Sequence, residues 1–233
     1  RWNCIRHPRT KQGQFKLAFW NGEKFNRPFC RGMKMADVRL HFASFCERSG
    51  RKPEELIDTV ATVRGDAWLA GGAIRRTLIG HELDSDFDFF FRSQEHLDAW
   101  RSALPPAMKL VKETPHHLQF FGTLDGKDKP ITVQAIRFKF YMSAADVIDS
   151  FDYTITQFAL DGADMVTTAE ALWDLGRKRL AVHKITYPVA SMRRLLKYGT
   201  QGFTACAGCM SELLRQTAAT PDLHAALQTT YVD

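Results

Sequence analysis

Apolar and polar positions follow a helical spacing near the beginning and in the last third of the chain, and a strand-like spacing between these parts. An early helix is predicted over 36–48. A second one begins at Pro53, where the fixed φ of proline suits a first turn, and Glu54 and Glu55 favour the positive end of its dipole. Beyond about residue 166 the pattern is helical again. Three late helices are predicted there, over 168–175, 189–198 and 207–217.

Short apolar runs separated by turn residues occupy the middle of the chain and predict alternating strands and helices. Gly80 ends one predicted helix, and Ser143 caps another through the Ser-x-x-Asp spacing to Asp146. Turn residues over 125–130 separate two strand-like stretches, which predicts a hairpin with a long loop. The remaining predictions are strands over 67–70 and 86–91, helices over 73–79 and 93–103, and hairpin strands over 117–124 and 131–141.

The composition of the 233 residues, 45% hydrophobic and 25% charged, is that of a globular protein with a full core. A net charge of +6 and a pI near 9.1 favour a polyanionic partner such as nucleic acid or a triphosphate. No apolar run approaches the roughly 18 residues of a membrane span, so we expect no membrane partner, and the oligomeric state stays open. Five cysteines at low density favour a reducing compartment. We expect a cytoplasmic protein, with an organellar location left open because the chain begins at Arg1 rather than Met.

Two acids, Asp86 and Asp88, open the otherwise apolar strand predicted over 86–91. In an extended strand they point to the same face, about 6.6 Å apart along the chain. Two like charges at that spacing repel each other unless a cation lies between them, and Mg²⁺ takes one or two carboxylates plus phosphate oxygens. The pair is therefore a candidate metal site, with an edge strand of two solvated acids as the alternative. Asp84 has the same spacing to Asp86 but is assigned to the preceding loop.

A strand, two glycines and a helix start follow one another around Gly71 and Gly72. Glycine lets backbone amides approach a phosphate closely, and a helix N-terminus adds unpaired N–H groups and a favourable dipole. Arg75, in the first turn of that helix, is a candidate for the same anion. A tight turn that binds nothing is the alternative. The short interval between this turn and Asp86 favours the phosphate site.

Four stretches of the chain, spread over residues 66–203, agree in order with the signature of one enzyme family. The first carries Gly-Gly-x-x-Arg, Leu-Ile-Gly and Asp-x-Asp at 71–75, 78–80 and 86–88. The other three are Phe151-Asp152-Tyr153-Thr154-Ile155, Leu172-Trp173-Asp174-Leu175 and Arg193-Arg194-Leu195-Leu196-Lys197-Tyr198. This set resembles the DNA polymerase β-like nucleotidyltransferases, in the branch that contains class II CCA-adding enzymes and bacterial poly(A) polymerases.

The resemblance implies an α/β (α+β) fold, in which a nucleotidyltransferase head has a mixed or antiparallel sheet flanked by helices. The head would cover 35–165, and a short helical, neck-like segment would follow over 166–233. Residues 1–34 are basic and aromatic. They would form an N-terminal arm that either stacks on RNA or packs against the head.

The resemblance also implies a metal-dependent enzyme that adds a nucleotide from an NTP to an RNA 3′ end, as in tRNA processing or poly(A) addition. Two Mg²⁺ ions are expected as cofactors, and ATP or another NTP as the substrate. The residues implied are Asp86 and Asp88 for the metal ions and catalysis, Gly71, Gly72 and Arg75 for the triphosphate, Asp152 and Thr154 for the sugar, and Arg194 and Lys197 for the nucleotide pocket.

The chain departs from the family pattern at the element that reads the base. The family has Glu-Asp-x-x-Arg, whereas this chain has Ala190-Ser191-Met192-Arg193-Arg194, which keeps the final arginine and loses both acids. We therefore expect a different or looser base choice. Arg76 and Ser150 stand where the family has Asp and Arg. The strand predicted from residue 131 lacks the third carboxylate of many relatives in the superfamily.

Two other functions stay open. One is a toxin-like or regulatory transferase that modifies a tRNA or a protein hydroxyl, which the short helical region and the altered base-reading element allow. The other is a non-catalytic RNA-binding relative, against which the retention of both Asp86 and Asp88 argues.

Cys206 and Cys209 have metal-ligand spacing. Because they lie in a helix-like segment, buried thiols are the favoured interpretation. His116 and His117 precede a strand, and a strand-edge pair with one exposed ring is favoured over a pair of metal ligands.

Overall fold

A computed structural model describes residues 38–48, 50, 67–81, 83, 86–124, 126 and 128–228. The predicted arm over 1–34, the helix beginning at Pro53 and the loop acid Asp84 lie outside these residues. Within the described ranges, no helix is both long enough and apolar enough to cross a membrane.

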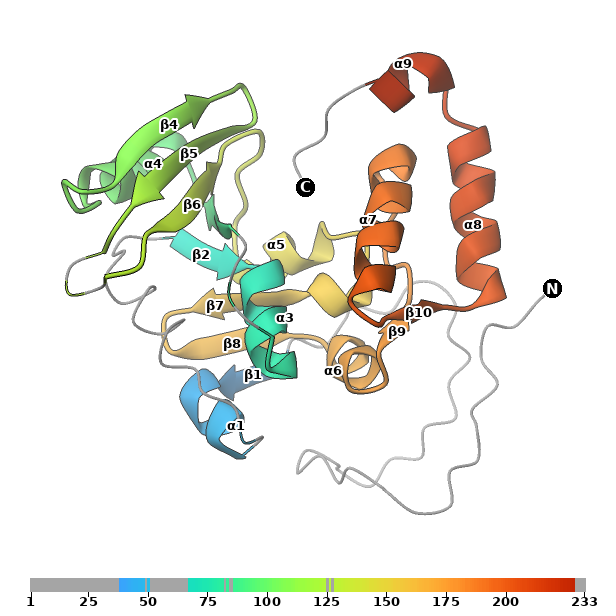
Figure 1. The fold of residues 1–233 in the computed structure, drawn as a ribbon, viewed down its shortest axis with the longest axis horizontal. Helices are drawn as coiled ribbons and strands as arrows, with labels where there is room; N and C mark the ends of the chain where they lie inside the picture. The colour runs from blue at the N-terminus through green and yellow to red at the C-terminus, as the bar shows by residue number, and fades with distance from the viewer. Residues whose placement is uncertain are drawn as a thin grey trace.

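An eight-stranded sheet forms the centre of the described chain, in the order β1-β8-β7-β2-β3-β6-β5-β4 (Figure 1). Strands β3 and β6 are parallel, whereas the other neighbouring pairs are antiparallel. The mixed sheet predicted from the sequence is therefore confirmed. Its strands are β1 (Val38–His41), β2 (Ala67–Ala70), β3 (Phe87–Phe91), β4 (Lys109–Glu113), β5 (His117–Gly122), β6 (Ile131–Ile136), β7 (Phe158–Asp161) and β8 (Asp164–Thr167).

Helices flank the sheet and continue beyond it toward the C-terminus, where α7 and α8 pack side by side (Figure 1). The short strands before and after α7, β9 (Arg179–Leu180) and β10 (Thr204–Ala205), pair with each other as a two-stranded parallel sheet. The helices are α1 (Phe42–Arg48), α3 (Gly72–Ile79), α4 (Gln94–Ser102), α5 (Ala144–Asp149), the 3-10 turn η1 (Thr154–Thr156), α6 (Ala169–Gly176), α7 (Pro188–Thr200), α8 (Ala207–Ala218) and α9 (Leu223–Gln228).

Strand β3 separates two hydrophobic clusters, because successive side chains of a strand point to opposite faces. Phe89 and Phe91 pack on Trp100 of α4, with ring centroids 5.2 and 5.3 Å from the Trp100 ring. Phe90 belongs to the cluster on the other face, which α5 closes through Val147. Asp88 is two residues before Phe90, so its side chain leaves the sheet on the α5 face.

Most of the elements predicted from the sequence are confirmed, and their capping residues act as expected. The strand over 67–70 has the predicted bounds. The side chains of Ser93 and Ser143 accept hydrogen bonds from the backbone N–H groups of His96 and Asp146. Gly80 ends α3 in the left-handed conformation at φ 71°.

Other predicted elements are wrong or missing, for reasons of tertiary structure. The helix over 36–48 is wrong in its first half, because residues 38–41 pair with β8 as strand β1. Strand β4 was not predicted, since all five of its residues are exposed at the sheet edge and show no apolar period. The β7–β8 hairpin was not predicted either, and β6 ends at residue 136 rather than at 141.

Candidate active site

The glycine turn between β2 and α3 has a backbone conformation that requires glycine at its first position. Gly71 has φ 86° and ψ −122°, a region that residues with a Cβ rarely adopt. Its N–H donates to the carbonyl oxygen of Phe158 at 2.8 Å. Ring atoms of Phe151 lie 3.8 Å from the position that a Cβ would take. The turn is thus fixed to the sheet through β7, with the first N–H groups of α3 directly after it.

The carboxylate pair lies beside this turn. Ala70, the last residue of β2, is the antiparallel partner of Asp88 on β3, and Gly71 follows directly. Asp86 lies just before β3, and both acids are partly buried. The two halves of the predicted site, which 13 residues separate in the sequence, are therefore adjacent in the fold.

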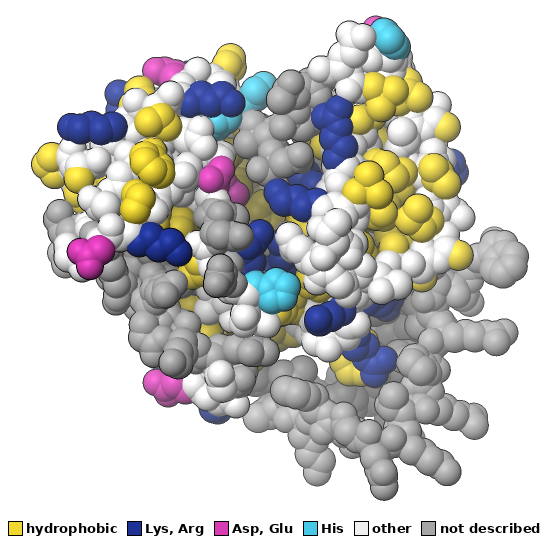
Figure 2. Space-filling view, viewed as in Figure 1, with side chains coloured by type: hydrophobic (Ala, Val, Ile, Leu, Met, Phe, Trp, Pro, Cys, Tyr) yellow, Lys and Arg dark blue, Asp and Glu magenta, His cyan; other side chains and the backbone are white. Residues whose placement is uncertain are grey.

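Basic side chains of α7 act on the same carboxylates. Burial, and then the negative charge of Asp86, raise the pKa of Asp88 to about 7, while the charges of Lys197 and Arg194 oppose this rise. These two residues are about one helical turn apart and therefore lie on one side of α7. Figure 2 shows Lys and Arg side chains gathered in the hollow between the sheet and the C-terminal helices.

Gln134 of β6 is a site residue that the sequence prediction missed. It is the register partner of Asp88 across the parallel β3–β6 pair, and its Nε2 donates to Oδ2 of Asp86. The residue is 4% exposed, and among the described residues its Oε1 has no hydrogen-bond partner. A signal was present in the sequence, because this amide stands between Val133 and Ala135 in an otherwise apolar stretch.

A buried hydrogen-bond network joins Asp152 to the start of α7. Oδ2 of Asp152 accepts from Oγ of Ser191 at 2.8 Å and from Nη1 of Arg194 at 3.0 Å. Asp152 is 8% exposed and Ser191 is 1% exposed. Ser191, which stands where the resembling element has an acid, is turned toward Asp152, and Asp152 is a carboxylate partner of Arg194.

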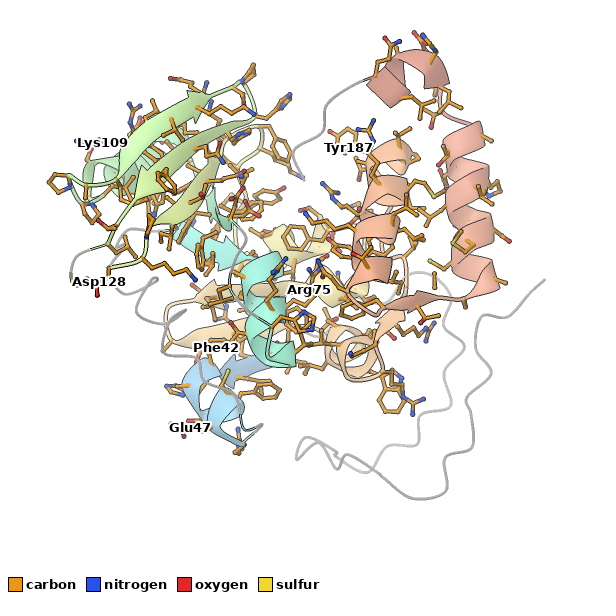
Figure 3. All side chains as sticks on the ribbon, in the orientation of Figure 1. Phe42, Glu47, Arg75, Lys109, Asp128 and Tyr187 are labelled. Carbon is orange, nitrogen blue, oxygen red and sulfur yellow. The ribbon has the colours of Figure 1, made fainter. Side chains whose placement is uncertain are left out.

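Two other predicted nucleotide-binding residues lie in the interior. Arg75 is 2% exposed and lies between α3 and α7 (Figure 3), where its Cζ is 4.4 Å from the centroid of the Tyr198 ring. Its Nη2 donates to Oε1 of Gln201 at 2.9 Å. Thr154 is 7% exposed, and its Oγ1 donates to Oδ2 of Asp174 at 2.7 Å. These contacts join α3 to the end of α7 and η1 to α6, and the roles of Arg75 and Thr154 in nucleotide binding stay predictions.

The residues of the site fit a divalent cation of the magnesium type. Two carboxylates share one face, the negative charge of one raises the pKa of the other, and an amide oxygen beside them is buried without a partner. Mg²⁺ is usually bound by one or two carboxylates and completed by water and substrate phosphates. Within the described chain, His, Cys, Asp and Glu form no group of three or more that would enclose a metal ion by themselves. The donor set is therefore that of an open site, which a substrate would complete.

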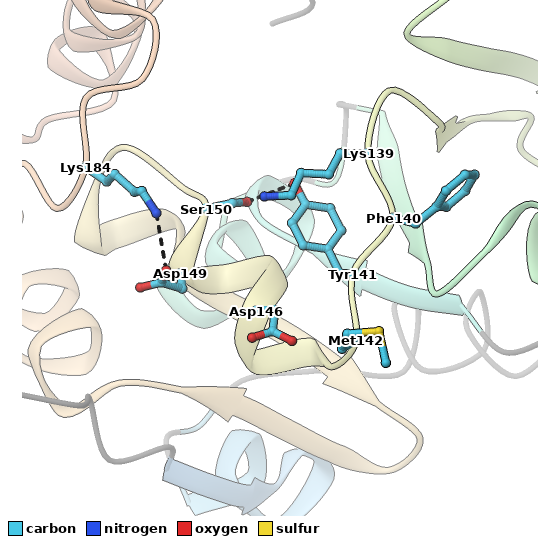
Figure 4. A pocket seen from close by; sticks show the side chains of 8 residues that line it. All are labelled: Lys139, Phe140, Tyr141, Met142, Asp146, Asp149, Ser150 and Lys184. Carbon is cyan, nitrogen blue, oxygen red and sulfur yellow. Dashed lines mark hydrogen bonds and ion pairs between the residues drawn. The ribbon is translucent and has the colours of Figure 1, made fainter.

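A second hollow lies beside α5 (Figure 4). It has a volume of about 320 Å³ and is bordered by Lys139, Tyr141 and Lys184, among others. Lys184 is paired with Asp149 at 3.4 Å, and the Tyr141 hydroxyl donates to Oγ of Ser150 at 3.1 Å. Because Lys184 and Tyr141 already have partners within the chain, this hollow is a poorer match for a nucleotide than the carboxylate site.

The histidine pair follows the interpretation favoured from sequence, whereas the cysteine pair follows it at one of its two residues. Cys209 is buried in α8, whereas Cys206, just before the first residue of α8, is partly exposed. His117 is 3% exposed, whereas His116 is exposed.

The mixed sheet, its flanking helices and the glycine turn beside two acids define a nucleotidyltransferase-like fold. The chain is similar to a solved CCA-adding enzyme in complex with CTP, with a TM-score of 0.56 and 18% identity, over 84% of this chain and 50% of that one. A CCA-adding enzyme of Thermotoga maritima in complex with tRNA gives a TM-score of 0.52 and 17% identity, over 84% and 50%. Identities this low show a shared fold and no more.

The family is more specific than the fold. Residues 38–178 match the Gabija anti-defense 2 family, and the chain belongs to this family. The Gabija anti-defense 2 protein of Bacillus phage SPbetaL7 is 29% identical over 159 residues, which are 65% of this chain and 36% of that protein. The chain thus spans about a third of that relative and half of the solved enzymes. The resemblance to CCA-adding enzymes inferred from motifs holds for the fold, and the family is Gabija anti-defense 2.

Proposed function

We propose that this chain is a metal-dependent nucleotidyltransferase that moves a nucleotide from an NTP to the 3′ end of an RNA. The observation that carries the proposal is the register of β2 with β3, which sets Gly71 beside Asp88. A backbone turn suited to phosphate and a carboxylate pair suited to a divalent cation are the two parts that must meet at one triphosphate.

Each part has a role that follows from its chemistry. Asp86 and Asp88 would hold Mg²⁺, expected as two ions, which when bound supplies Lewis-acid activation of the acceptor hydroxyl and neutralises triphosphate charge. The backbone N–H groups of Gly72 and the first turn of α3 would donate to triphosphate oxygens. Gly71, whose own N–H is bonded to Phe158, would shape the turn that places these groups. Lys197 and the guanidinium of Arg194, both on α7, would add positive charge near the carboxylates.

The reaction joins the acceptor oxygen to the α-phosphorus and breaks the bond to the β-phosphate, so pyrophosphate leaves. Asp152 follows Phe151, whose ring lies against the glycine turn, and it binds Arg194. We infer that the sugar and base of the nucleotide lie along this network. Ser191 is buried, and its hydroxyl donates to Asp152. Recognition of the base would therefore rest on Arg194 without an acid at residue 191. It would be less selective than recognition by a pair of an Asp and an Arg side chain.

A hydroxyl of a tRNA or of a protein is the second candidate acceptor. Membership of the Gabija anti-defense 2 family favours it. The family name sets its members against a defence system called Gabija, so components of that system become candidate acceptors. In this alternative the same carboxylates and the same triphosphate turn act on a different hydroxyl.

Labelled nucleotide distinguishes these acceptors. The chain is incubated with Mg²⁺ and each α-³²P-NTP in turn, first with total RNA and then with the purified Gabija proteins. Label that ribonuclease releases supports the RNA acceptor, and label that only protease releases supports the protein acceptor. If label enters neither, although the chain is folded by circular dichroism and Mn²⁺ has also been supplied, the transferase proposal fails.

A further inference from the structure

The buried amide of Gln134 is bonded on one side and unpaired on the other. Nε2 donates to Asp86, whereas Oε1 has no partner although it is shielded from water. A buried polar atom without a hydrogen bond costs about 1–3 kcal/mol. Such atoms are rare in folded proteins, and one explanation is an ion that the chain itself does not contain.

The position of Gln134 beside the two acids points to a cation as the partner that Oε1 gains once the amide turns toward them. Gln134 and Asp88 are register partners in a parallel pair, so both side chains leave the sheet on the same face. The amide of Gln134 already contacts Asp86, the other member of the carboxylate pair. Amide oxygens are accepted ligands of hard cations, as in calcium sites. A rotation of the amide about its last bond exchanges Nε2 and Oε1 in nearly the same space.

We propose that Gln134 is the third member of the metal site and works in two orientations. Without metal, its Nε2 donates to Asp86 and holds that carboxylate beside Asp88. With metal, the cation takes the lone pair of Asp86, and the amide turns to present Oε1 to the cation. The inference rests on the proposed metal-holding role of Asp86 and Asp88.

One consequence concerns charge. A neutral third ligand leaves the site with two negative charges, where a carboxylate at this position would make three. The free chain therefore binds divalent ions weakly, and the triphosphate supplies the missing charge. Mg²⁺ and NTP should each raise the affinity of the chain for the other, by the same factor.

Mn²⁺ titrations followed through the electron paramagnetic resonance of the free ion measure this site without any catalysis. Gln134→Met keeps the shape of the side chain and removes both amide atoms. Gln134→Glu adds a carboxylate. Gln119 is the antiparallel partner of Gln134 on β5, so Gln119→Glu adds the same charge one strand further from the acids and serves as the matched control.

The expected order of affinities follows from ligation. Gln134→Glu should bind Mn²⁺ at least about 10-fold more tightly than the wild type, and Gln134→Met about 10-fold more weakly, in the range seen when a supporting partner of a metal site is lost. Gln119→Glu should stay within about 3-fold, since its carboxylate lies one strand further from the acids and takes no ligand position. The assignment is overturned if Gln134→Glu and Gln119→Glu raise the affinity for Mn²⁺ equally, or if Gln134→Met binds Mn²⁺ like the wild type.

Side-chain amide resonances provide a second readout that does not depend on whether the Met variant folds. The ¹⁵N–¹H₂ resonances of the Gln134 side chain should shift on addition of Mg²⁺, and this shift should be lost in Asp88→Asn. The corresponding resonances of Gln119 should not change. A Gln134 pair that Mg²⁺ leaves unchanged also overturns the assignment.

Failure of the transferase proposal has a different signature. Mn²⁺ binding with the expected order among the variants, but no nucleotide transfer to any acceptor, contradicts the transferase and leaves the Gln134 assignment in place. Transfer by a wild type whose metal affinity is insensitive to residue 134 contradicts the Gln134 assignment alone.

Discussion

Asp88 is a residue whose acid–base behaviour is strongly changed by its surroundings. Burial and the charge of Asp86 raise its pKa to about 7, above the value it has in the unfolded chain. The metal-free fold therefore binds the proton more tightly than the unfolded chain does. It follows that the free energy of unfolding rises as the pH falls from about 7 toward 4, and that this gain is lost again above about 7. A cation competes with the same proton, so metal binding should tighten as the pH rises through about 7.

Asp86→Asn is expected to lower the pKa of Asp88, because the charge of Asp86 is the second-largest cause of the raised value. The pKa should stay above that of an ordinary Asp, since burial, the largest cause, remains. A ¹³C titration of the side-chain carboxyl groups by NMR in the metal-free protein measures it. Asp98→Asn, at an exposed position on α4, is the control that should leave Asp88 unchanged. An Asp88 pKa insensitive to Asp86→Asn would contradict the close pairing of the two acids.

Arg75 is a buried cation whose described contacts include the Tyr198 ring and the amide of Gln201. Arg75→Ala should lower the free energy of unfolding by about 2–4 kcal/mol, because it leaves a cavity. Arg75→Met keeps most of the volume and removes a buried charge, so its effect should be below about 1.5 kcal/mol. Urea denaturation measures both variants. A stable Arg75→Met variant with normal nucleotide affinity supports a packing role, whereas a stable variant with lost affinity supports the predicted contact with the triphosphate.

At the scale of elements, the turn between β2 and α3 combines two glycines with different requirements. Gly71 has a positive φ, whereas a Cβ on Gly72 would have no atom within 4 Å. Gly71→Ala should therefore lower the free energy of unfolding by about 1–3 kcal/mol. Gly72→Ala, the matched control, should be neutral or more stable by up to about 1 kcal/mol. Thermal unfolding of the two variants checks the difference, and equal losses would contradict this description of the turn.

The sequence predicted elements well where a local signal fixes them. Ser93, Ser143 and Gly80 mark helix ends through local hydrogen bonds or a positive φ, and their helices are confirmed. Strands whose partners lie far away in the sequence were harder to predict. Val38–His41 forms a strand because β8, more than 120 residues later, offers it an antiparallel partner. No local periodicity carries that information.

The site shows the same division. Gly71, Gly72, Asp86 and Asp88 were predicted because their spacing is short and regular, and the fold brings them together. Gln134 could be placed beside the acids only once the parallel register of β3 and β6 was known. The loss of the acid at Ser191 was read from the sequence, but the bond of Asp152 to Arg194 depends on how α7 packs against the segment before η1.

At the scale of the whole molecule, the site lies where the sheet meets the C-terminal helices (Figure 1). The sheet contributes the glycine turn, the acids and Gln134, and α7 contributes positive charge. The match to the Gabija anti-defense 2 family ends at residue 178, before α7 begins. The basic face of α7 therefore lies outside the matched segment, and its role needs a test of its own.

Arg194→Met and Lys197→Met are expected to weaken NTP binding by about 10-fold each, since a hydrogen bond to a charged group contributes roughly 1.5–3 kcal/mol. The salt dependence of binding should also fall, because fewer charges are screened. Fluorescence titration with a labelled NTP at two salt concentrations measures both effects. Arg215→Met, which removes an exposed charge on α8, should bind NTP like the wild type. If Arg215→Met lost as much affinity for NTP as the α7 variants, the loss would follow from the net charge of the chain and not from contacts of α7.

The central claim, that Asp86 and Asp88 make this fold a nucleotidyltransferase, is tested most directly by the initial rate of ³²P transfer from an α-labelled NTP. The wild type is compared with the Asp86→Asn, Asp88→Asn double variant and with Asp98→Asn, all under the same Mg²⁺ concentration and with the same acceptor. The double variant should lose about 1,000-fold or more in rate, as expected when several kcal/mol of metal-dependent stabilisation are removed, while Asp98→Asn keeps the wild-type rate. Transfer by the double variant at the wild-type rate, or its absence from the wild type with every NTP and acceptor, would contradict the account.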